Sequence, residues 1–181
     1  MSDSNYDYDV LVIGAGPGGY VAAIRAAQLG LKTACAESRE TLGGTCLNVG
    51  CIPSKAMLHA SEYFDAAANG TFAKLGIKVK PELDLDTMHG QRRDAVKQLT
   101  GGIEYLFKKN KVAHLHGLGR IIDANTVAVM GPDGAEQRVH TAAVVIATGS
   151  HPASLPGVVC DGVYVGTSTE ALAYDAVPEH L

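Results

Sequence analysis

The 181-residue sequence predicts an α/β fold in which helices flank a parallel sheet and a small antiparallel meander is added to it. Residues 9–13 form a short, continuously apolar run, which is typical of a strand buried on both faces of a parallel sheet. A glycine-rich turn and a helical pattern follow directly, and a second β-like run occupies residues 32–37. Short β-like pieces separated by turn residues then lie between residues 112 and 141.

The first turn has the spacing of a dinucleotide-binding loop. Gly14 permits a tight turn, Gly16 lets the backbone approach a pyrophosphate, and Gly19 lets the following helix (residues 20–29) pack closely on the strand. Glu37 ends the second strand, where a carboxylate can accept hydrogen bonds from a ribose diol. These features predict a Rossmann-like dinucleotide site; the alternative is a glycine-rich turn that binds nothing.

Cys46 and Cys51 form a candidate redox pair. On one unbroken helix, residues five apart point about 140° away from each other, too far round for an easy disulfide. We therefore expect a bend at Gly50 and a new helix that begins near Cys51, with Pro53 in its first turn. The amide groups at such a helix start favour thiolate over thiol, as dithiol exchange requires. The alternative is a pair of buried structural cysteines.

The rest of the chain is expected to alternate between helices and short strands. The cysteine helix should end near Ala68, and a second helix over residues 84–111 should be interrupted or kinked at Gly101-Gly102. Four β-like pieces (residues 112–115, 119–122, 126–129 and 137–140) predict the meander, an apolar strand follows at 142–147, and a short helix at 168–175. Cys35 and Cys160 are interpreted as small packing residues.

Composition excludes several classes of function. The formal net charge of −4 gives no basic footprint for nucleic acid or an anionic membrane. No apolar run is long enough for a membrane span, and the polar, acidic start is not a secretory signal, so we expect a soluble, cytoplasmic protein. A lasting structural disulfide is unexpected there, which favours cysteines that cycle between two redox states. No metal site is expected.

The motifs resemble those of the flavoprotein disulfide reductases over nearly the whole chain. The strongest match is Gly43–Lys55 (GGTCLNVGCIPSK), in which the final Ile-Pro-Ser-Lys is similar to the dihydrolipoamide dehydrogenases rather than to glutathione or mercuric reductases. Residues 99–102, 116–119 and 147–150 agree further. The alternatives are another disulfide reductase of this family, or a non-catalytic nucleotide-binding module.

The resemblance implies an FAD site, which would be incomplete in this chain because the family's flavin site draws on later residues, and it assigns roles to the residues present. Cys46 would exchange with dihydrolipoamide, Cys51 would face the flavin, and Lys55 would place a cation beside it. Electrons would then pass through FAD to NAD. The cofactor-binding residues implied are Gly14, Gly16, Pro17, Gly18, Gly19, Glu37, Ser38, Gly44, Thr45, Cys46, Cys51, Lys55, Gly117, Ala147, Thr148, Gly149 and Ser150.

The resemblance also implies a domain division and partners. Residues 1–150 would form the FAD-binding domain, and residues 151–181 would lead into an NAD-binding domain and an interface domain that this sequence lacks. NAD would bind only a longer parent, which is expected to be a homodimer serving the lipoyl groups of 2-oxo acid dehydrogenase or glycine cleavage complexes. The chain alone should show little turnover, and none of its histidines should act as the catalytic base.

Overall fold

The computed structural model describes residues 6–180. Residues 1–5, which belong to the polar start discussed above, and Leu181 lie outside that range. The chain falls into two compact units: one holds the chain up to Asn48 together with Gln98–His151, and the other holds Val49–Lys97 and the residues from Pro152 onward. The fold is a mixed sheet with flanking helices, which confirms the predicted α/β class.

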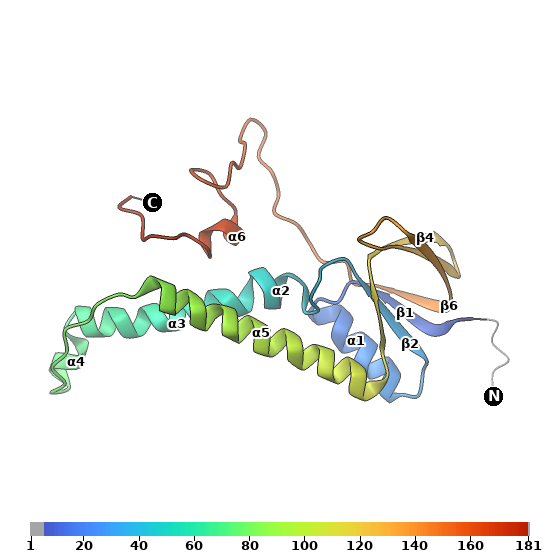
Figure 1. Cartoon of the computed structure of the whole chain (residues 1–181), viewed down its shortest axis with the longest axis horizontal. Helices are drawn as coiled ribbons and strands as arrows, with labels where there is room; N and C mark the ends of the chain where they lie inside the picture. The colour runs from blue at the N-terminus through green and yellow to red at the C-terminus, as the bar shows by residue number, and fades with distance from the viewer. Residues whose placement is uncertain (1–5, 181) are drawn as a thin grey trace. The chain divides into compact units, whose positions relative to one another are not determined.

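The parallel part of the sheet is built around β1 (Tyr8–Ile13). It pairs in parallel with β2 (Thr33–Glu37) on one side and with the second half of β6 (Glu136–Ile146) on the other. Helix α1 (Pro17–Gln28) connects β1 to β2 and packs on both, as Figure 1 shows. The predicted β-α-β unit is therefore confirmed.

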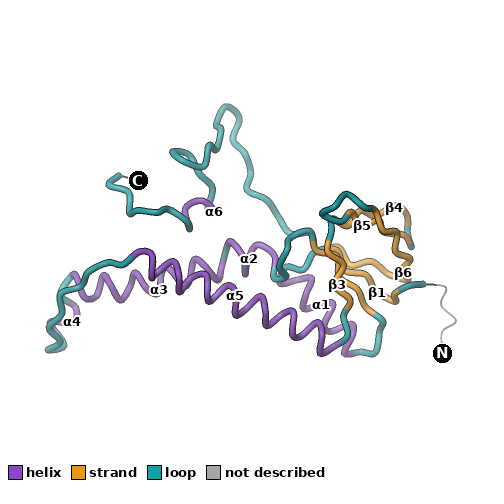
Figure 2. The backbone as a smooth tube through the Cα atoms, viewed as in Figure 1, coloured by secondary structure: helices purple, strands orange, loops and turns teal. Residues whose placement is uncertain are grey.

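The antiparallel part contains β4 (Leu118–Asp123), β5 (Thr126–Met130) and the first half of β6. The strand order across the sheet is β3-β2-β1-β6-β5-β4, and its strands are the orange segments of Figure 2. One expectation about the meander is wrong: its first piece, β3 (Ala113–His116), pairs in parallel with β2 instead. A long helix precedes β3, and a crossover of that length is what a parallel pairing requires.

β6 is one continuous strand where the sequence suggests two. The strand runs on through Thr141 at the junction, which is fully buried and whose hydroxyl donates to the carbonyl oxygen of Ala143 at 2.9 Å. Residues 142–146 pair with β1 and with no other strand of the described chain. Their apolar side chains are accordingly more exposed than the pattern suggests, and Ile146 is 67% exposed.

The core lies between the two parts of the sheet. Leu11 and Ile13 of β1 pack, together with alanines of β2, against Val127, Val129 and Val139 of the antiparallel strands. Side chains alternate along a strand, so residues such as Val12 point to the opposite face, on which α1 packs. Both faces of β1 are thus covered up to the point where the glycine-rich turn begins.

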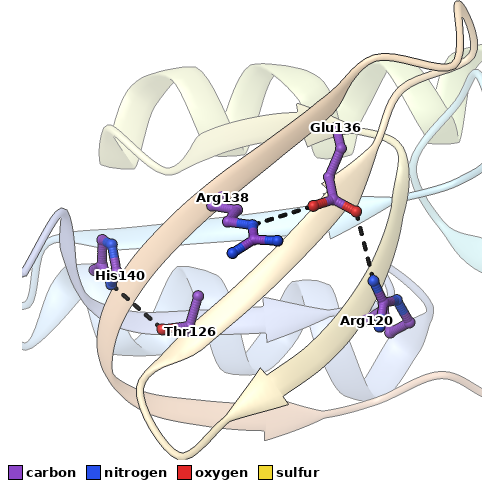
Figure 3. A network of polar contacts seen from close by, with 5 residues as sticks. All are labelled: Arg120, Thr126, Glu136, Arg138 and His140. Carbon is purple, nitrogen blue, oxygen red and sulfur yellow. Dashed lines mark hydrogen bonds and ion pairs between the residues drawn. The ribbon is translucent and has the colours of Figure 1, made fainter.

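Charged side chains line the antiparallel strands away from that core (Figure 3). Glu136 bonds Arg120 at 3.5 Å and Arg138 at 3.2 Å, and Thr126 Oγ1 lies 3.4 Å from Nδ1 of His140. The arginine side chains are 67% and 66% exposed, so each pair contributes about 1 kcal/mol at most. The two arginines are therefore solvated, whereas Thr126 is buried.

The helix that carries the second cysteine has the predicted limits. Helix α2 (Gly44–Val49) ends before Gly50, and α3 (Cys51–Ala68) begins directly after it. Pro53 is buried in the first turn of α3, where a missing N–H costs nothing. A short helix, α4 (Thr71–Lys74), follows and contacts α3. Neither α2 nor α4 is predicted from the sequence.

Helix α5 (Leu85–Asn110) is capped by Asp84, whose carboxylate accepts from the backbone N–H and the hydroxyl of Thr87. The predicted interruption at Gly101-Gly102 is wrong, because the helix continues through both glycines. Each costs about 1 kcal/mol relative to alanine, which the buried neighbours Ile103 and Phe107 offset. Neither α5 nor another helix between residues 6 and 180 has the length and apolar character needed to span a bilayer.

The segment after residue 151 contains α6 (Ser168–Ala171), shorter than predicted, with a capping box formed by Thr167 and Glu170. Within the second unit, Nε2 of His89 on α5 donates to the carbonyl oxygen of Tyr174 at 2.9 Å. Cys160 is exposed in this segment, so its interpretation as a packing residue is wrong. Irregular chain beside it leaves no core for the thiol to enter.

Replacing Gly19 by alanine should destabilise the fold strongly. A Cβ at Gly19 would lie 1.7 Å from the carbonyl oxygen of Gly14, a backbone atom that cannot move without opening the turn. We expect the free energy of unfolding, measured by urea denaturation, to fall by about 3 kcal/mol. Gly18→Ala is the matched control: nothing lies within 4 Å of its Cβ position, so this variant should keep or gain stability. Equal losses in both variants would contradict this packing.

Candidate functional site

The glycine-rich turn between β1 and α1 packs against the end of β6. Gly14 has a φ of 97°, and a Cβ there would lie 2.3 Å from the carbonyl oxygen of Ala147. A Cβ on Gly19 would lie closer still, 1.7 Å from the carbonyl oxygen of Gly14, so the turn closes only without side chains at these two positions. Gly16 differs, because the nearest atom to its Cβ position is the Cα of Gly44 at 3.9 Å. The turn therefore leaves room for a ligand to approach its backbone at Gly16.

Glu37 is buried and holds this turn in place. Its Oε2 accepts from the backbone N–H of Ala15 at 2.8 Å, and its Oε1 accepts from the backbone N–H of Arg39 at 2.9 Å. The hydroxyl of Ser38 adds a longer bond of 3.4 Å. A carboxylate has about four acceptor positions, so Glu37 keeps the capacity to accept from ribose hydroxyls as well. Its predicted position at the end of β2 is confirmed.

The start of α2 lies directly on the glycine-rich turn. The N–H of Gly43 donates to the carbonyl oxygen of Ala15 at 2.8 Å. Gly44 has a φ of 58°, and a Cβ on it would lie 2.5 Å from the Cα of Gly16. Thr45 and Cys46 follow in the first turn of α2. The helix that carries the first cysteine therefore begins in contact with the dinucleotide-type turn.

The other predicted residues of the first unit meet at the same edge of the sheet. The N–H of Gly117 donates to the carbonyl oxygen of Glu37, and the N–H of Ala147 donates to that of Ile13, both at 2.8 Å. This is the carboxyl edge of the parallel strands, where open α/β sheets bind ligands. The sequence-predicted residues that lie along it are Gly14, Gly16–Gly19, Glu37, Ser38, Gly44–Cys46, Gly117 and Ala147–Ser150.

Cys46 belongs to the first unit, whereas Cys51 and Lys55 belong to the second. Cys46 is half-buried, and Cys51 and Lys55 are exposed. The predicted bend is confirmed at Gly50, whose carbonyl oxygen accepts from the hydroxyl of Ser54 at 2.6 Å and so fixes the first turn of α3. The disulfide between the two cysteines and the role of Lys55 stay predictions.

Cys35 has the packing role that the sequence indicates. It is fully buried in β2, and its Sγ lies 3.7 Å from the carbonyl oxygen of Gly14. Burial, and to a smaller extent the nearby carboxylate of Glu37, raises the pKa of its thiol to about 12. Since the thiolate is the reactive form, Cys35 is inert at neutral pH.

Two histidines stand on one face of β3, next to Gly117. Burial lowers the pKa of His114, and His116, whose ring centroid lies 6.1 Å away, lowers it further. The carboxylates of Glu37 and Glu104 oppose this shift without reversing it. His114 is therefore neutral at pH 7 and supplies no cation to an anionic ligand.

Asn48 is the side chain of this site that the sequence analysis does not single out. Its amide bonds to Thr41 and to two backbone carbonyl groups, that of Leu42 before α2 and that of Gly44 at the start of α2. A signal was present, because asparagine is unfavourable inside a helix unless its side chain bonds to nearby backbone. The bond from the backbone N–H of Ala15 to Glu37 could not be predicted from side-chain types, because its donor is a backbone group.

The arrangement fits a dinucleotide. The first amide groups of α1 receive no side-chain cap, because Gly16 is the N-cap and Pro17 follows it. Such groups, together with the helix dipole, favour a pyrophosphate. Space over Gly16 and the buried carboxylate of Glu37 are two further features that a dinucleotide site needs. Within residues 6–180, no three His, Cys, Asp or Glu side chains are grouped so as to hold a metal ion.

Comparisons with known proteins agree with this geometry. Residues 8–181 match the family described as pyridine nucleotide-disulphide oxidoreductase. The chain is 58% identical over 174 residues to dihydrolipoyl dehydrogenase 3 of Pseudomonas aeruginosa, covering 96% of this chain and 37% of that protein. It is 54% identical over 182 residues to the mitochondrial dihydrolipoyl dehydrogenase of Rattus norvegicus, covering 99% and 36%. The chain thus spans little more than a third of the length of the curated relatives it matches.

Replacing Glu37 by glutamine should weaken the glycine-rich turn. An amide can accept from only one of the two backbone N–H groups and turns its own N–H₂ toward the other. We expect the free energy of unfolding to fall by about 1–3 kcal/mol in urea denaturation. Glu40→Gln is the matched control at an exposed glutamate close by, and it should change stability by less than about 0.5 kcal/mol. A similar effect of the two changes would argue against a stabilising role for these two hydrogen bonds of Glu37.

The rate of alkylation should differ between exposed and buried cysteines. In the reduced, folded protein at pH 8, iodoacetamide should modify Cys160 at least about a hundredfold faster than Cys35, because Cys35 is buried and its pKa is about 12. Peptide-resolved mass spectrometry measures both rates in one sample. Adding denaturant should bring the two rates together; comparable rates before unfolding would show that Cys35 is not in the core.

Proposed function

The chain belongs to the pyridine nucleotide-disulphide oxidoreductase family, and from that premise we propose that it is the FAD-binding, redox-disulfide portion of a dihydrolipoamide dehydrogenase. One observation carries the proposal: the helix with Cys46 starts on the glycine-rich turn, where Gly43 bonds Ala15 and Gly44 touches Gly16. A thiol two residues beyond Gly44 is thereby tied to the place where a dinucleotide would bind.

Different groups around the turn would bind different parts of the cofactor. Backbone amides from Gly14 to Gly19 would hold the pyrophosphate, and Glu37 would accept from the ribose hydroxyls. The backbone at Gly117 and at Thr148–Ser150 would line the rest of the cofactor at the same sheet edge. FAD, when bound, supplies a two-electron acceptor between the cysteine pair and NAD.

The cysteines perform the thiol chemistry. A thiolate of dihydrolipoamide attacks Cys46 in the Cys46–Cys51 disulfide, the S–S bond breaks, and Cys51 leaves as a thiolate. The second substrate thiol then displaces Cys46, so that lipoamide carries the new disulfide and the protein has gained two electrons. Lys55 lies one helical turn after Cys51 on α3, where its cation would stabilise negative charge that develops on the cofactor.

The proposed substrate class comes from the relatives. Those quoted above are named dihydrolipoyl dehydrogenases, and we infer for the complete protein the oxidation of dihydrolipoyl groups with reduction of NAD. The partners would be the lipoyl-bearing subunits of 2-oxo acid dehydrogenase or glycine cleavage complexes, and the complete protein would be a homodimer. The cytoplasmic location stays a prediction, and the name of the rat relative specifies mitochondria.

Oxidation of the purified chain tests the proposal. Mild oxidation with lipoamide should remove two thiols and link the peptides of Cys46 and Cys51, as mass spectrometry after digestion would show. Cys46→Ser and Cys51→Ser should each abolish the link, because the pair has no substitute. Cys160→Ser is the matched control and should form the link normally, since that thiol lies in an irregular, exposed segment.

Flavin binding is measured on the same protein. Incubation with FAD and removal of the excess should leave a bound yellow chromophore, and Glu37→Gln should weaken its retention about tenfold or more, as expected for a lost charged hydrogen bond. If neither the disulfide nor bound flavin forms, the chain is a non-catalytic module and the proposal is wrong. If the link forms and glutathione, but not dihydrolipoamide, reduces it, the substrate class is wrong.

A further inference from the structure

We infer that Asn48 is a positioning residue for Cys46, which it controls through the segment 41–44. This inference rests on the proposed function of Cys46 as the thiol that exchanges with substrate. All of the contacts involved lie within the first unit.

Asn48 uses both halves of its amide. Its Oδ1 accepts from the hydroxyl of Thr41 at 2.6 Å, while its Nδ2 donates to the carbonyl oxygens of Leu42 at 3.2 Å and Gly44 at 2.9 Å. Two acceptors and one donor converge on a single side chain, a pattern that only a carboxamide can satisfy. Aspartate offers no donor, and an aliphatic residue offers neither group.

These bonds fix the segment on which Cys46 depends. The bond to Gly44 crosses one turn of α2, so Cys46 lies within the bridged turn. The bonds to Thr41 and Leu42 extend the bridge back into the preceding segment, in which Leu42 is 1% exposed. Asn48, near the carboxyl end of α2, therefore holds the start of this helix in addition to the helix's own backbone.

The same segment is attached to the glycine-rich turn. Gly43 donates to Ala15, and Ala15 in turn donates to the carboxylate of Glu37. The three hydrogen bonds of Asn48, which we call the Asn48 clamp, thus fix α2 with respect to the glycine-rich turn. That turn is itself held by Glu37, so the clamp does not merely tighten a free loop. Loss of Asn48 should release Cys46 while leaving the glycine-rich turn closed by Glu37.

A purely local role for Asn48 gives a different expectation. Asparagines near a helix end often bond the carbonyl group four residues earlier and add only a little helix stability. Asn110 of α5 does this, with its Nδ2 donating to the carbonyl oxygen of Leu106 at 2.8 Å. Asn110→Ala is therefore the matched control. It removes a bond of the same kind, from an asparagine to the carbonyl group four residues earlier, at a place where no further bonds like those of Asn48 to Thr41 and Leu42 are involved.

The experiment uses the reduced 181-residue chain, the Asn48→Ala, Thr41→Val and Asn110→Ala variants, and iodoacetamide with peptide-resolved mass spectrometry. The rate at Cys46 is divided by the rate at the exposed Cys160, and the buried Cys35 reports global opening. We expect Asn48→Ala to raise the ratio about threefold or more, and Thr41→Val to raise it less, since one hydrogen bond is lost instead of three. Asn110→Ala should leave the ratio unchanged.

Three outcomes would overturn the inference. An unchanged ratio in Asn48→Ala would show that the clamp does not control Cys46. A parallel rise at Cys35 would show a general loss of stability. A rise of the same size in Asn110→Ala would reduce Asn48 to an ordinary helix-end residue. If Asn48→Ala does not fold, Thr41→Val tests the inference instead, because it keeps the shape of the side chain and removes only the hydroxyl donor. A raised ratio would support the inference, and an unchanged ratio would overturn it.

The measurement needs neither flavin nor a disulfide. Failure of the proposed function, in which no Cys46–Cys51 link forms on oxidation, is therefore read from a different experiment than failure of the clamp. A shifted Cys46 ratio without a disulfide would leave the clamp standing and remove its catalytic meaning.

Discussion

A buried carboxylate joins the two ends of the dinucleotide unit. Glu37 stands at the end of β2, and its bond to the N–H of Ala15 reaches the turn that follows β1. The cost of burying a charge is met here by backbone donors on both oxygens, the condition under which a buried carboxylate stabilises a fold. The side chain of Glu37 holds Ala15, whose carbonyl oxygen accepts from Gly43 at the start of α2, and the backbone carbonyl oxygen of Glu37 accepts from Gly117.

Around this carboxylate, close backbone contact replaces side-chain packing. Gly14, Gly19 and Gly44 each lie where a Cβ would strike a neighbouring main chain. Main-chain atoms therefore line the candidate site, and they offer N–H and carbonyl groups at fixed positions without the entropy cost of ordering long side chains. Such a surface suits a ligand made of phosphates and hydroxyl groups, and it links the chemistry of the site directly to the stability of the fold.

Local patterns predicted much of this arrangement. The apolar run of β1, the glycine spacing and Glu37 predicted the β-α-β unit, and Gly50 with Pro53 predicted that α3 begins at Cys51. Each of these signals is contained in a few consecutive residues. The convergence of Gly44, Gly117 and Ala147 on the same edge followed only from the resemblance to a known family, because it depends on pairings between distant segments.

The wrong predictions share a cause. β3 has the same short β-like pattern as a meander strand, and only the crossover through α5 decides its parallel pairing with β2. Gly101-Gly102 signals a break, yet buried neighbours on the same helix outweigh that propensity. Asn48 makes sense only once the partners of its amide are known. In each case contacts that the local pattern does not reveal decided the outcome, although the partners of Asn48 lie only four to seven residues away along the chain.

β6 belongs to both parts of the sheet at once: its first residues run antiparallel to β5 and its last residues run parallel to β1. A strand has a period of two, so one inserted residue anywhere inside it would turn every later side chain to the other face and misplace Ala147, which follows the strand and lies beside Gly14. The turn around Gly131–Gly134, which precedes β6, carries no such constraint. Related chains should therefore vary in length at that turn and keep the eleven residues of this strand constant.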